Sequence, residues 1–334
     1  MIKHLIRNRL RNELRRLQHK TGLLSASGDL STGYDKAWVR DNVYESLGLE
    51  DAEDHDALRA VYGGLFDIFL KHESQIDRAL RSERLHDDDY IHPRYCPVSL
   101  EQVPGPWANR QHDSVGVFLF KVGDLEDRGI HVIRGEDDRR ILQKLVDYLG
   151  KIEYWHNPDS GMWEQELAVR SSSVGACLAG LGKISAYVNV DPGLLRHGKD
   201  ALDKLLPYET SERKVDLSLL SLIFPYAIVD DQQRDLIIRN VENHLVRERG
   251  VVRYHGDWYY SNGSEAEWTF GFPWLAVIYR NMGKKDRYAH YLRRTIGLLH
   301  RGAVMPELYY AGTSRANENT SFGWSTALAI CALS

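Results

Sequence analysis

The chain has 334 residues and a formal net charge of −4, so it is long enough for two domains or for one closed repeat architecture. This charge gives no reason to expect a nucleic acid as partner. No stretch reaches the roughly 18 apolar residues of a membrane span, and the N-terminal segment lacks the unbroken apolar run of a signal peptide.

The spacing of the cysteines bears on the cellular compartment in which the protein is expected. Cys96, Cys177 and Cys331 lie far apart in the sequence and do not show the spacing of metal ligands. We therefore expect reduced thiols. Together with the missing membrane and signal segments, they predict a soluble, cytoplasmic protein without a membrane partner.

The first predicted helix covers residues 2–20. Its apolar residues, among them Leu10, Leu14 and Leu17, recur at three- and four-residue spacing, and Gly22 follows as a stop signal. Its arginine-rich face is interpreted as a solvated outer face rather than as a site for a membrane or RNA.

Helical periodicity continues along the whole chain, with almost no alternating strand pattern. Serines at 171–173 are expected to cap one of the helices, because their hydroxyls can accept hydrogen bonds from free amides of the first turn. The predicted helices cover residues 2–20, 41–49, 55–72 with an extension toward 80, 112–123, 137–154, 171–188, 192–206, 216–229, 231–247, 265–282, 285–300 and 320–333.

Long and short connections alternate between these helices. In a set of helices that run up and down, every second connection lies at the same end, so the long loops should share one face. The pattern predicts an all-α fold of six helical hairpins closed into a ring, an (α/α)6 toroid, as a single domain over residues 1–334. Because no strong sequence repeat is visible, an open solenoid is the alternative. The long loops cover residues 23–41, 83–111, 155–170, 207–215, 248–264 and 301–319.

The long loops carry flat aromatic side chains interleaved with Arg, Asp, Asn and Gln. Such a mixture suits a sugar, since ring faces stack on aromatic planes and planar polar groups bind pairs of hydroxyls. We expect a carbohydrate partner in a funnel at this end of the ring. The candidates in loop order are Tyr34, Trp38, Arg40 and Asp41; Trp107, Gln111 and Asp113; Trp163, Glu164 and Glu166; Glu209, Arg213 and Asp216; Arg253, Tyr254, Asp257 and Trp258; and Glu307, Asn317 and Asn319.

Two of these residues are candidates for acid–base chemistry. Cleavage of a glycosidic bond needs one protonated and one ionised carboxyl on opposite sides of the bond. Glu164 and Glu307 lie on the third and sixth long loops, which should face each other across a ring of six hairpins. A separation of roughly 6.5 to 9.5 Å would leave room for a water molecule and predicts inversion at the anomeric carbon.

We expect no metal and no cofactor. His92, His112 and His156 lack both the helical spacing and the neighbouring carboxylates of a metal site. A Gly-x-Ser-x-Gly elbow for serine catalysis is also missing.

Five ordered motifs resemble family 15 of the glycoside hydrolases, the glucoamylase family, and the related domain at the start of the phosphorylase kinase α and β subunits. The similar segments span nearly the whole chain. They are Trp38-Val-Arg-Asp41, Trp107 to Asp113 with Gln111 between them, Gly161-Met-Trp-Glu164, Arg253-Tyr254 and Met305-Pro-Glu-Leu-Tyr309.

The resemblance implies a six-hairpin toroid and an inverting, exo-acting enzyme that releases β-glucose from α-glucosides. It implies Glu164 as general acid and Glu307 as general base. Hydroxyls of the terminal glucose would be held by Arg40, Asp41 and Arg253, with Tyr34, Trp107 and Trp163 as walls of the pocket.

The chain also departs from the family pattern. Gln165 stands where fungal glucoamylases have a second glutamate. We also expect neither an N-terminal β-sandwich nor a starch-binding module beside the six hairpins. We therefore expect short soluble α-glucans or disaccharides as substrates. Two alternatives stay open: an inactive glycan-binding regulatory module like the kinase-subunit domain, or another sugar reaction on the same scaffold.

Overall fold

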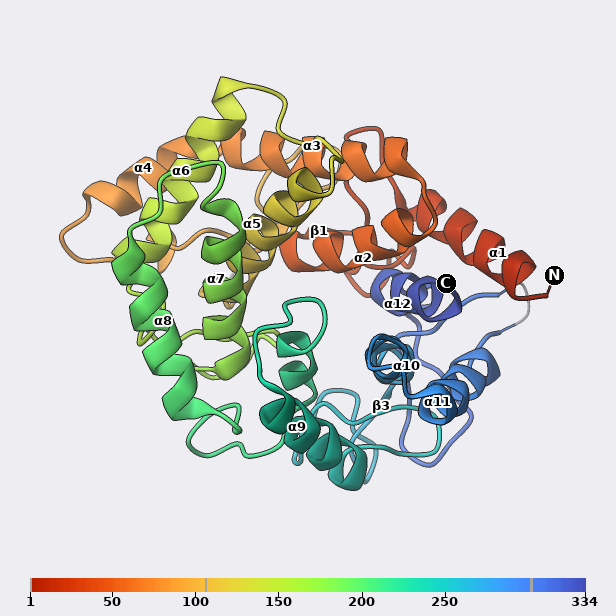
Figure 1. Cartoon of the computed structure of the whole chain (residues 1–334). Coiled ribbons are helices and arrows are strands. Elements are labelled where there is room, and N and C mark those ends of the chain that lie inside the picture. Colours follow the sequence, from red (N-terminus) through yellow and green to blue (C-terminus); the bar gives the residue numbers. More distant parts are fainter. Residues whose placement is uncertain (1, 106, 301–302) are drawn as a thin grey trace.

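Residues 2–105, 107–300 and 303–334 are described by the computed structural model (Figure 1). Residue 1 and three residues of the predicted long loops, 106, 301 and 302, lie outside the described residues.

The helices form an inner and an outer layer around a common axis (Figure 1). Neighbouring inner elements contact one another all the way round, from α2 through α5, α7, η2, α10 and α12 back to α2, so the ring is closed. The inner elements are α2 (Val39–Asp51), α5 (His112–Asp127), α7 (Ser171–Ile184), the 3-10 helix η2 (Leu217–Leu222), α10 (Gly271–Asn281) and α12 (Gly323–Leu333). This arrangement confirms the predicted (α/α)6 toroid and excludes the open solenoid.

The outer helices pack on the outside of this ring, except that α4 packs mainly on the outer helices α3 and α6 (Figure 1). Their amphipathic pattern follows from their position, since only one face of each is covered. α9, for example, buries only Ile237, Ile238 and Val241, whereas every residue of α12 is buried. The outer helices are α1 (Ile2–Leu17), α3 (His55–Lys71), α4 (Glu73–Arg81), α6 (Glu136–Lys151), α8 (Pro192–Leu205), α9 (Asp231–His244) and α11 (Lys285–Gly297).

Glycines allow two of the inner helices, α5 and α7, to approach closely. A Cβ atom on Gly116 would lie 2.5 Å from the carbonyl carbon of Ala176, and one on Gly180 would lie 2.3 Å from the carbonyl oxygen of Gly116. Because these neighbours are backbone atoms, a larger residue would push the helices apart.

Two short strand pairs tie the long loops together. β1 (Ala37–Trp38) pairs antiparallel with β2 (Arg94–Tyr95), and β3 (Glu267–Trp268) pairs antiparallel with β4 (Leu308–Tyr309). The first pair joins the first two long loops, and the second fixes the sixth loop to the segment that leads into α10. A 3-10 turn, η1 (Asp87–Asp89), lies within the second loop.

The prediction of a helix over 216–229 is wrong. The structure has only η2 there, and its N-cap Asp216 accepts a hydrogen bond from the amide of Ser218. Pro225 follows shortly after η2, and a proline cannot donate the helical hydrogen bond and disfavours a helical residue before it. The fourth inner element is therefore short.

Several further helix boundaries differ from the prediction by a few residues. α10 begins at Gly271 rather than at residue 265, because residues 267 and 268 form β3. The helix predicted to extend from residue 55 toward 80 is divided at His72 into α3 and α4.

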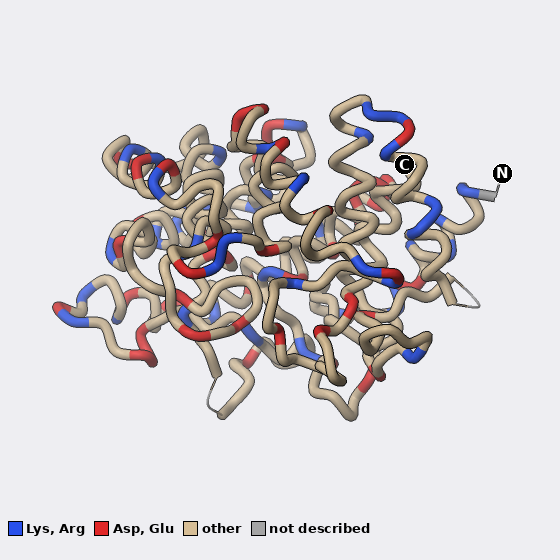
Figure 2. Tube along the Cα trace, turned by 90° about the horizontal axis from the view of Figure 1, so that it is seen from below, with Lys and Arg blue, Asp and Glu red and all other residues tan. Residues whose placement is uncertain are grey.

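Basic and acidic residues are interspersed in the view of Figure 2, in keeping with the small net charge of −4. Within the described parts of the chain, no helix is long and apolar enough to cross a membrane.

Candidate active site

An inner pocket lies among the long loops, with a cavity volume of about 60 Å³. Its wall comes from the first, third, fifth and sixth long loops and from the segments that lead into α10 and α12. It is lined by Tyr34, Trp38, Arg40, Asp41, Met162, Trp163, Glu164, Arg253, Trp268, Phe270, Glu307, Phe322 and Trp324. Eight of the predicted site residues, Glu164 and Glu307 among them, are thus brought together.

A wider outer cavity of about 490 Å³ shares Tyr34, Trp163, Glu164 and Arg253 with the inner pocket. Trp107, predicted as a wall residue, lines this outer cavity. The guanidinium of Arg94 lies 3.6 Å from the centroid of its ring. The site is therefore a narrow pocket that opens into a broader mouth.

Glu164 lies in a tight turn of the third loop. Its backbone has a φ of 57°, a left-handed conformation that costs a non-glycine residue about 1–2 kcal/mol. Its Oε1 accepts hydrogen bonds from Nε1 of Trp38 at 2.8 Å and from Nε2 of Gln111 at 3.0 Å. Both bonds end on Oε1, which leaves Oε2 as the oxygen available to a ligand.

Arg40 lies behind Glu164 and connects it to the second loop. The guanidinium donates to Oε1 of Gln111 at 2.8 Å and to Oδ2 of Asp113 at 3.2 Å, and its NH2 lies 3.7 Å from Oε1 of Glu164. Burial alone would lower the pKa of Arg40, but the carboxylates of Asp113, Asp41 and Glu164 hold it above its ordinary value. Gln111 and Asp113 thus support the pocket from behind rather than lining it.

Asp41 is buried in the inner pocket. Burial raises the pKa of its carboxyl to about 7, because Arg40 only partly offsets the loss of water and the charges of Glu164 and Glu307 add to the shift. Its protonation state therefore depends on both candidate carboxylates.

Glu307 is 1% exposed. Its Oε2 accepts a hydrogen bond from Nδ2 of Asn319 at 2.8 Å and another from Nδ2 of Asn317. Burial raises the pKa of Glu307, while the two amides and Arg253 oppose that shift. Glu307 is fixed and desolvated, in contrast to the partly exposed Glu164.

Arg253 is held by a fork of two hydrogen bonds. Its Nε and NH2 donate to Asp257 at 2.6 and 2.7 Å, and the guanidinium lies 4.2 Å from the ring centroid of Trp268. The NH1 atom is the part of the fork left for a ligand. Next along the loop, the hydroxyl of Tyr259 lies 2.7 Å from that of Tyr34.

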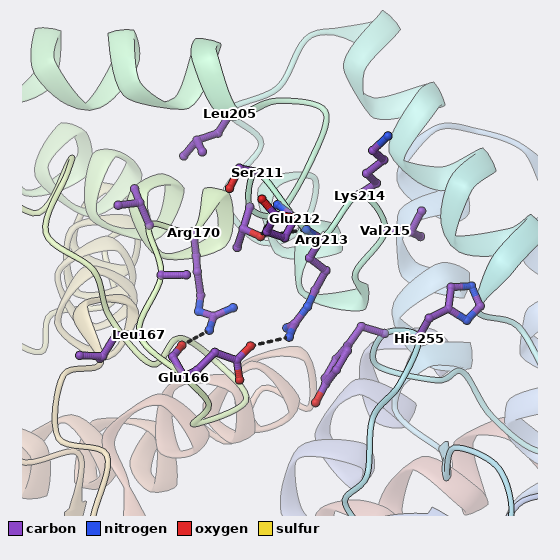
Figure 3. A pocket seen from close by; sticks show the side chains of 14 residues that line it. Glu166, Leu167, Arg170, Leu205, Ser211, Glu212, Arg213, Lys214, Val215 and His255 are labelled. Atoms are coloured by element: carbon purple, nitrogen blue, oxygen red, sulfur yellow. Dashed lines mark hydrogen bonds and ion pairs between the residues drawn. The ribbon is translucent and has the colours of Figure 1, made fainter.

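Tyr254, which was predicted to contact substrate, lies in the wall of a separate side cavity. This cavity of about 740 Å³ (Figure 3) shares Glu166 with the outer cavity. Gln165 donates to the hydroxyl of Tyr254 and accepts from Arg213 at 2.7 Å. Gln165, the residue that differs from fungal glucoamylases, is thus hydrogen-bonded to protein groups through both its amide nitrogen and its amide oxygen.

The aromatic floor of the inner pocket, apart from the predicted Trp163, was missed in the sequence. Trp163, Phe270 and Trp324 stack on one another, with the planes of Phe270 and Trp324 8° apart. The only hint in the sequence is that Phe270 comes just before an inner helix and Trp324 at the start of another. Other missed residues are Tyr259, Trp268 and Phe322.

In the part of the chain that the structure describes, no group of three or more His, Cys, Asp or Glu side chains could hold a metal ion. The chemistry that the site itself offers is acid–base chemistry. Three carboxyl groups, those of Asp41, Glu164 and Glu307, line one pocket whose walls are aromatic rings and charged donors, and Glu164 and Glu307 lie in unlike environments.

Comparisons with known proteins identify related sequences and related folds. The sequence model of Glycosyl hydrolases family 15 matches residues 2–188. The phosphorylase b kinase regulatory subunit alpha, skeletal muscle isoform, of Rattus norvegicus is 24% identical over 361 residues, which cover 89% of this chain and 28% of the relative. The chain therefore spans under a third of the length of that relative.

Two solved structures share the fold. A glycosidase variant in complex with glucose superposes with a TM-score of 0.84 at 20% identity, covering 99% of this chain and 96% of the other. A bacterial glucoamylase complexed with acarbose gives a TM-score of 0.71 at 15% identity, covering 97% of this chain and 54% of the other. With the match over more than half of its length, the chain belongs to family 15 of the glycosyl hydrolases.

Proposed function

We propose that the protein is an inverting, exo-acting α-glucosidase that hydrolyses terminal α-linked glucose from soluble oligo- or disaccharides and releases β-glucose. One observation carries the proposal: Glu164 and Glu307, from the third and sixth long loops, line the same aromatic pocket. Paired carboxyl groups on such loops are the chemical requirement for glycosidic cleavage.

Glu164 acts as the general acid. Its Oε1 is held by Trp38 and Gln111, so Oε2 can protonate the glycosidic oxygen at the boundary between the inner pocket and the mouth. Glu307 acts as the general base and accepts a proton from the attacking water. The amides of Asn317 and Asn319 hold its Oε2 and leave Oε1 for that water.

The shape of the site supports removal of a single terminal sugar. The rings of Trp268, Phe270, Phe322 and Trp324 close the inner pocket, so a chain can enter only by its end. Arg40, Asp41 and NH1 of Arg253 would bind hydroxyls of the terminal glucose. Glucose and acarbose, bound by two structural relatives, are ligands of this class.

The three cysteines are free thiols in the structure, two of them buried. This state suits a reducing compartment, and we propose the cytoplasm as the location.

The test is glucose release from maltose, isomaltose, trehalose and maltotriose by the wild type and by Glu164→Gln and Glu307→Gln. Each substitution should lower kcat by about 10²- to 10⁴-fold, because each removes one proton-transfer group. Glu318→Gln, on the same loop as Glu307, is the matched control and should keep full activity. NMR of the first product should show β-glucose.

Release of α-glucose would contradict inversion. Full activity of either glutamine variant would contradict the assignment of the carboxyl groups, and no turnover of any α-glucoside would contradict the function.

A second function is a regulatory module that binds a glycan without cleaving it. The similarity to a kinase regulatory subunit over 89% of this chain favours it. It predicts saturable binding of maltotetraose with no release of glucose over hours, which calorimetry and a glucose assay distinguish from hydrolysis.

A further inference from the structure

The fourth long loop looks the poorest in candidate ligands, yet Arg213 on this loop contacts the turn that carries Glu164. NH1 of Arg213 donates to Oε1 of Gln165 at 2.7 Å, and NH2 donates to Oε1 of Glu166 at 3.2 Å. Figure 3 shows the Arg213 side chain pointing toward Glu166 across the side cavity. The two residues that follow Glu164 are thus held by one guanidinium.

The residue before Glu164 is held by the same loop. Nε1 of Trp163 donates to Oδ1 of Asp216 at 2.8 Å, and Oδ2 of Asp216 accepts from NH1 of Arg213 at 3.2 Å. We call Arg213 and Asp216 the loop-four brace. It holds the side chains on both sides of Glu164 but does not touch Glu164 itself.

Contacts with the inner ring and with the fifth loop hold the two residues of the loop-four brace in place. Asp216 is fully buried and caps η2 through the amide of Ser218 at 2.8 Å. The guanidinium of Arg213 lies 3.7 Å from the ring centroid of Tyr254, and its side chain is only 15% exposed. The inner ring and the fifth loop therefore fix the brace.

Glu164 needs such support because its backbone is in the left-handed region, with a φ of 57°. A non-glycine residue stays in that conformation only where its surroundings determine it. Two hydrogen bonds hold its Oε1 from the first and second loops, and the brace holds its chain neighbours from the fourth.

We propose that Arg213 is a positioning residue for the general acid: through Trp163, Gln165 and Glu166 it fixes the turn that aims Oε2 of Glu164 at the glycosidic oxygen. This inference rests on the proposed function, in which Glu164 donates a proton.

The test compares two substrates that differ in their need for that proton. Maltose must receive a proton on its leaving oxygen, whereas α-glucosyl fluoride releases fluoride, which leaves as an anion with little help from an acid. Both need Glu307 to accept a proton from water. A misplaced acid therefore harms maltose hydrolysis selectively.

Arg213→Met keeps the length of the side chain and removes its donors. We expect kcat for maltose to fall by about 10- to 100-fold, as for a small misplacement of a reacting group, and kcat for the fluoride to change less than about threefold. Arg213→Lys, which can still reach one or two acceptors, should give an intermediate loss. Lys214→Met, one residue along the same loop, is the matched control and should leave both rates unchanged.

Glu164→Gln separates failure of the brace from failure of the proposed function. If Glu164→Gln lowers maltose turnover selectively but Arg213→Met lowers both substrates equally or neither, the brace is refuted and the acid assignment stands. If Glu164→Gln does not discriminate between the two substrates, the proposed function fails.

A second measurement does not depend on turnover. In Arg213→Met, amide hydrogen exchange in the peptide over residues 159–168 should become faster by about tenfold or more, while exchange in α5 and α12 stays unchanged. Unchanged exchange over 159–168 would overturn the proposal even for a protein without glucosidase activity. If Arg213→Met does not fold, Arg213→Lys and Gln165→Ala provide the same two readouts.

Discussion

Trp38 donates its indole N–H to Oε1 of Glu164 at 2.8 Å, although the two residues are 126 positions apart and belong to different long loops. This hydrogen bond connects the first loop to Glu164, the proposed proton donor. In β1 the backbone of Trp38 pairs with that of Arg94 in the second loop. The orientation of one carboxyl group thus depends on three loops at once.

Removing this hydrogen bond should weaken the acid. Trp38→Phe keeps an aromatic wall but has no N–H, and a hydrogen bond to a charged group contributes about 1.5–3 kcal/mol. We expect kcat/KM for maltose to fall by roughly 10- to 100-fold, since each 1.4 kcal/mol is a factor of ten. Trp155→Phe, whose ring stacks on His197 away from the pocket, is the control and should be neutral.

The pH dependence of activity should respond to Asn317. Burial raises the pKa of Glu307, and the amides of Asn317 and Asn319 oppose the shift. Loss of one donor in Asn317→Ala should raise that pKa further. Because the proposed base works only when ionised, the acidic limb of the kcat/KM profile should move to higher pH. Asn189→Ala, on the surface, should not move it, and a shift to lower pH would contradict the role of Glu307.

Stability should depend on His92 at mildly acidic pH. Burial lowers the pKa of His92 to about 4, whereas an unfolded chain would bind that proton near 6.5. Unfolding is therefore favoured as the pH falls from about 6.5 toward 4, by about 2 kcal/mol at pH 5 from this group.

In His92→Asn, which can still accept the hydrogen bond that the amide of Arg94 donates to Nδ1 at 3.1 Å, the loss of stability between pH 7 and pH 5 should be smaller. Urea unfolding at both pH values measures it. His4→Asn, on an exposed part of α1, should keep the pH dependence of the wild type. An equally steep loss in His92→Asn would contradict the prediction.

The close approach of α5 and α7 should make Gly116 sensitive to substitution. In Gly116→Ala the new methyl group would lie 2.5 Å from the backbone of Ala176, so we expect a loss of about 1–3 kcal/mol in the free energy of unfolding. Gly182→Ala, in α7 with no atom within 4 Å of the new Cβ, is the control and should be neutral or stabilising by about 0.5–1 kcal/mol. Thermal unfolding of both variants tests the difference.

Helical periodicity and the alternation of long and short connections were sufficient to predict the ring and the shared face of the long loops. They failed where local sequence is ambiguous. The apolar run after Asp216 resembles a helix but ends at Pro225, and the two-residue strands β3 and β4 are too short to produce an alternating pattern.

Individual candidate ligands could be predicted because sugar binding needs recognisable residue types. The contacts by which these residues hold one another in place could not be predicted. Arg213 and Gln165 are 48 positions apart, and only the closed ring brings them together. The roles of Glu164 and Glu307 stay predictions until the variants are measured.

Closure of the ring has a consequence for how activity arises during folding. α12 contacts both α2 and α1, so the two ends of the described chain must meet before the inner wall is complete. Contacts of such long sequence separation are slow to form, because the intervening chain loses its freedom before the contact forms. In refolding from urea, helical circular dichroism should therefore return before the proposed glucosidase activity, and the interval between them should report when α12 docks.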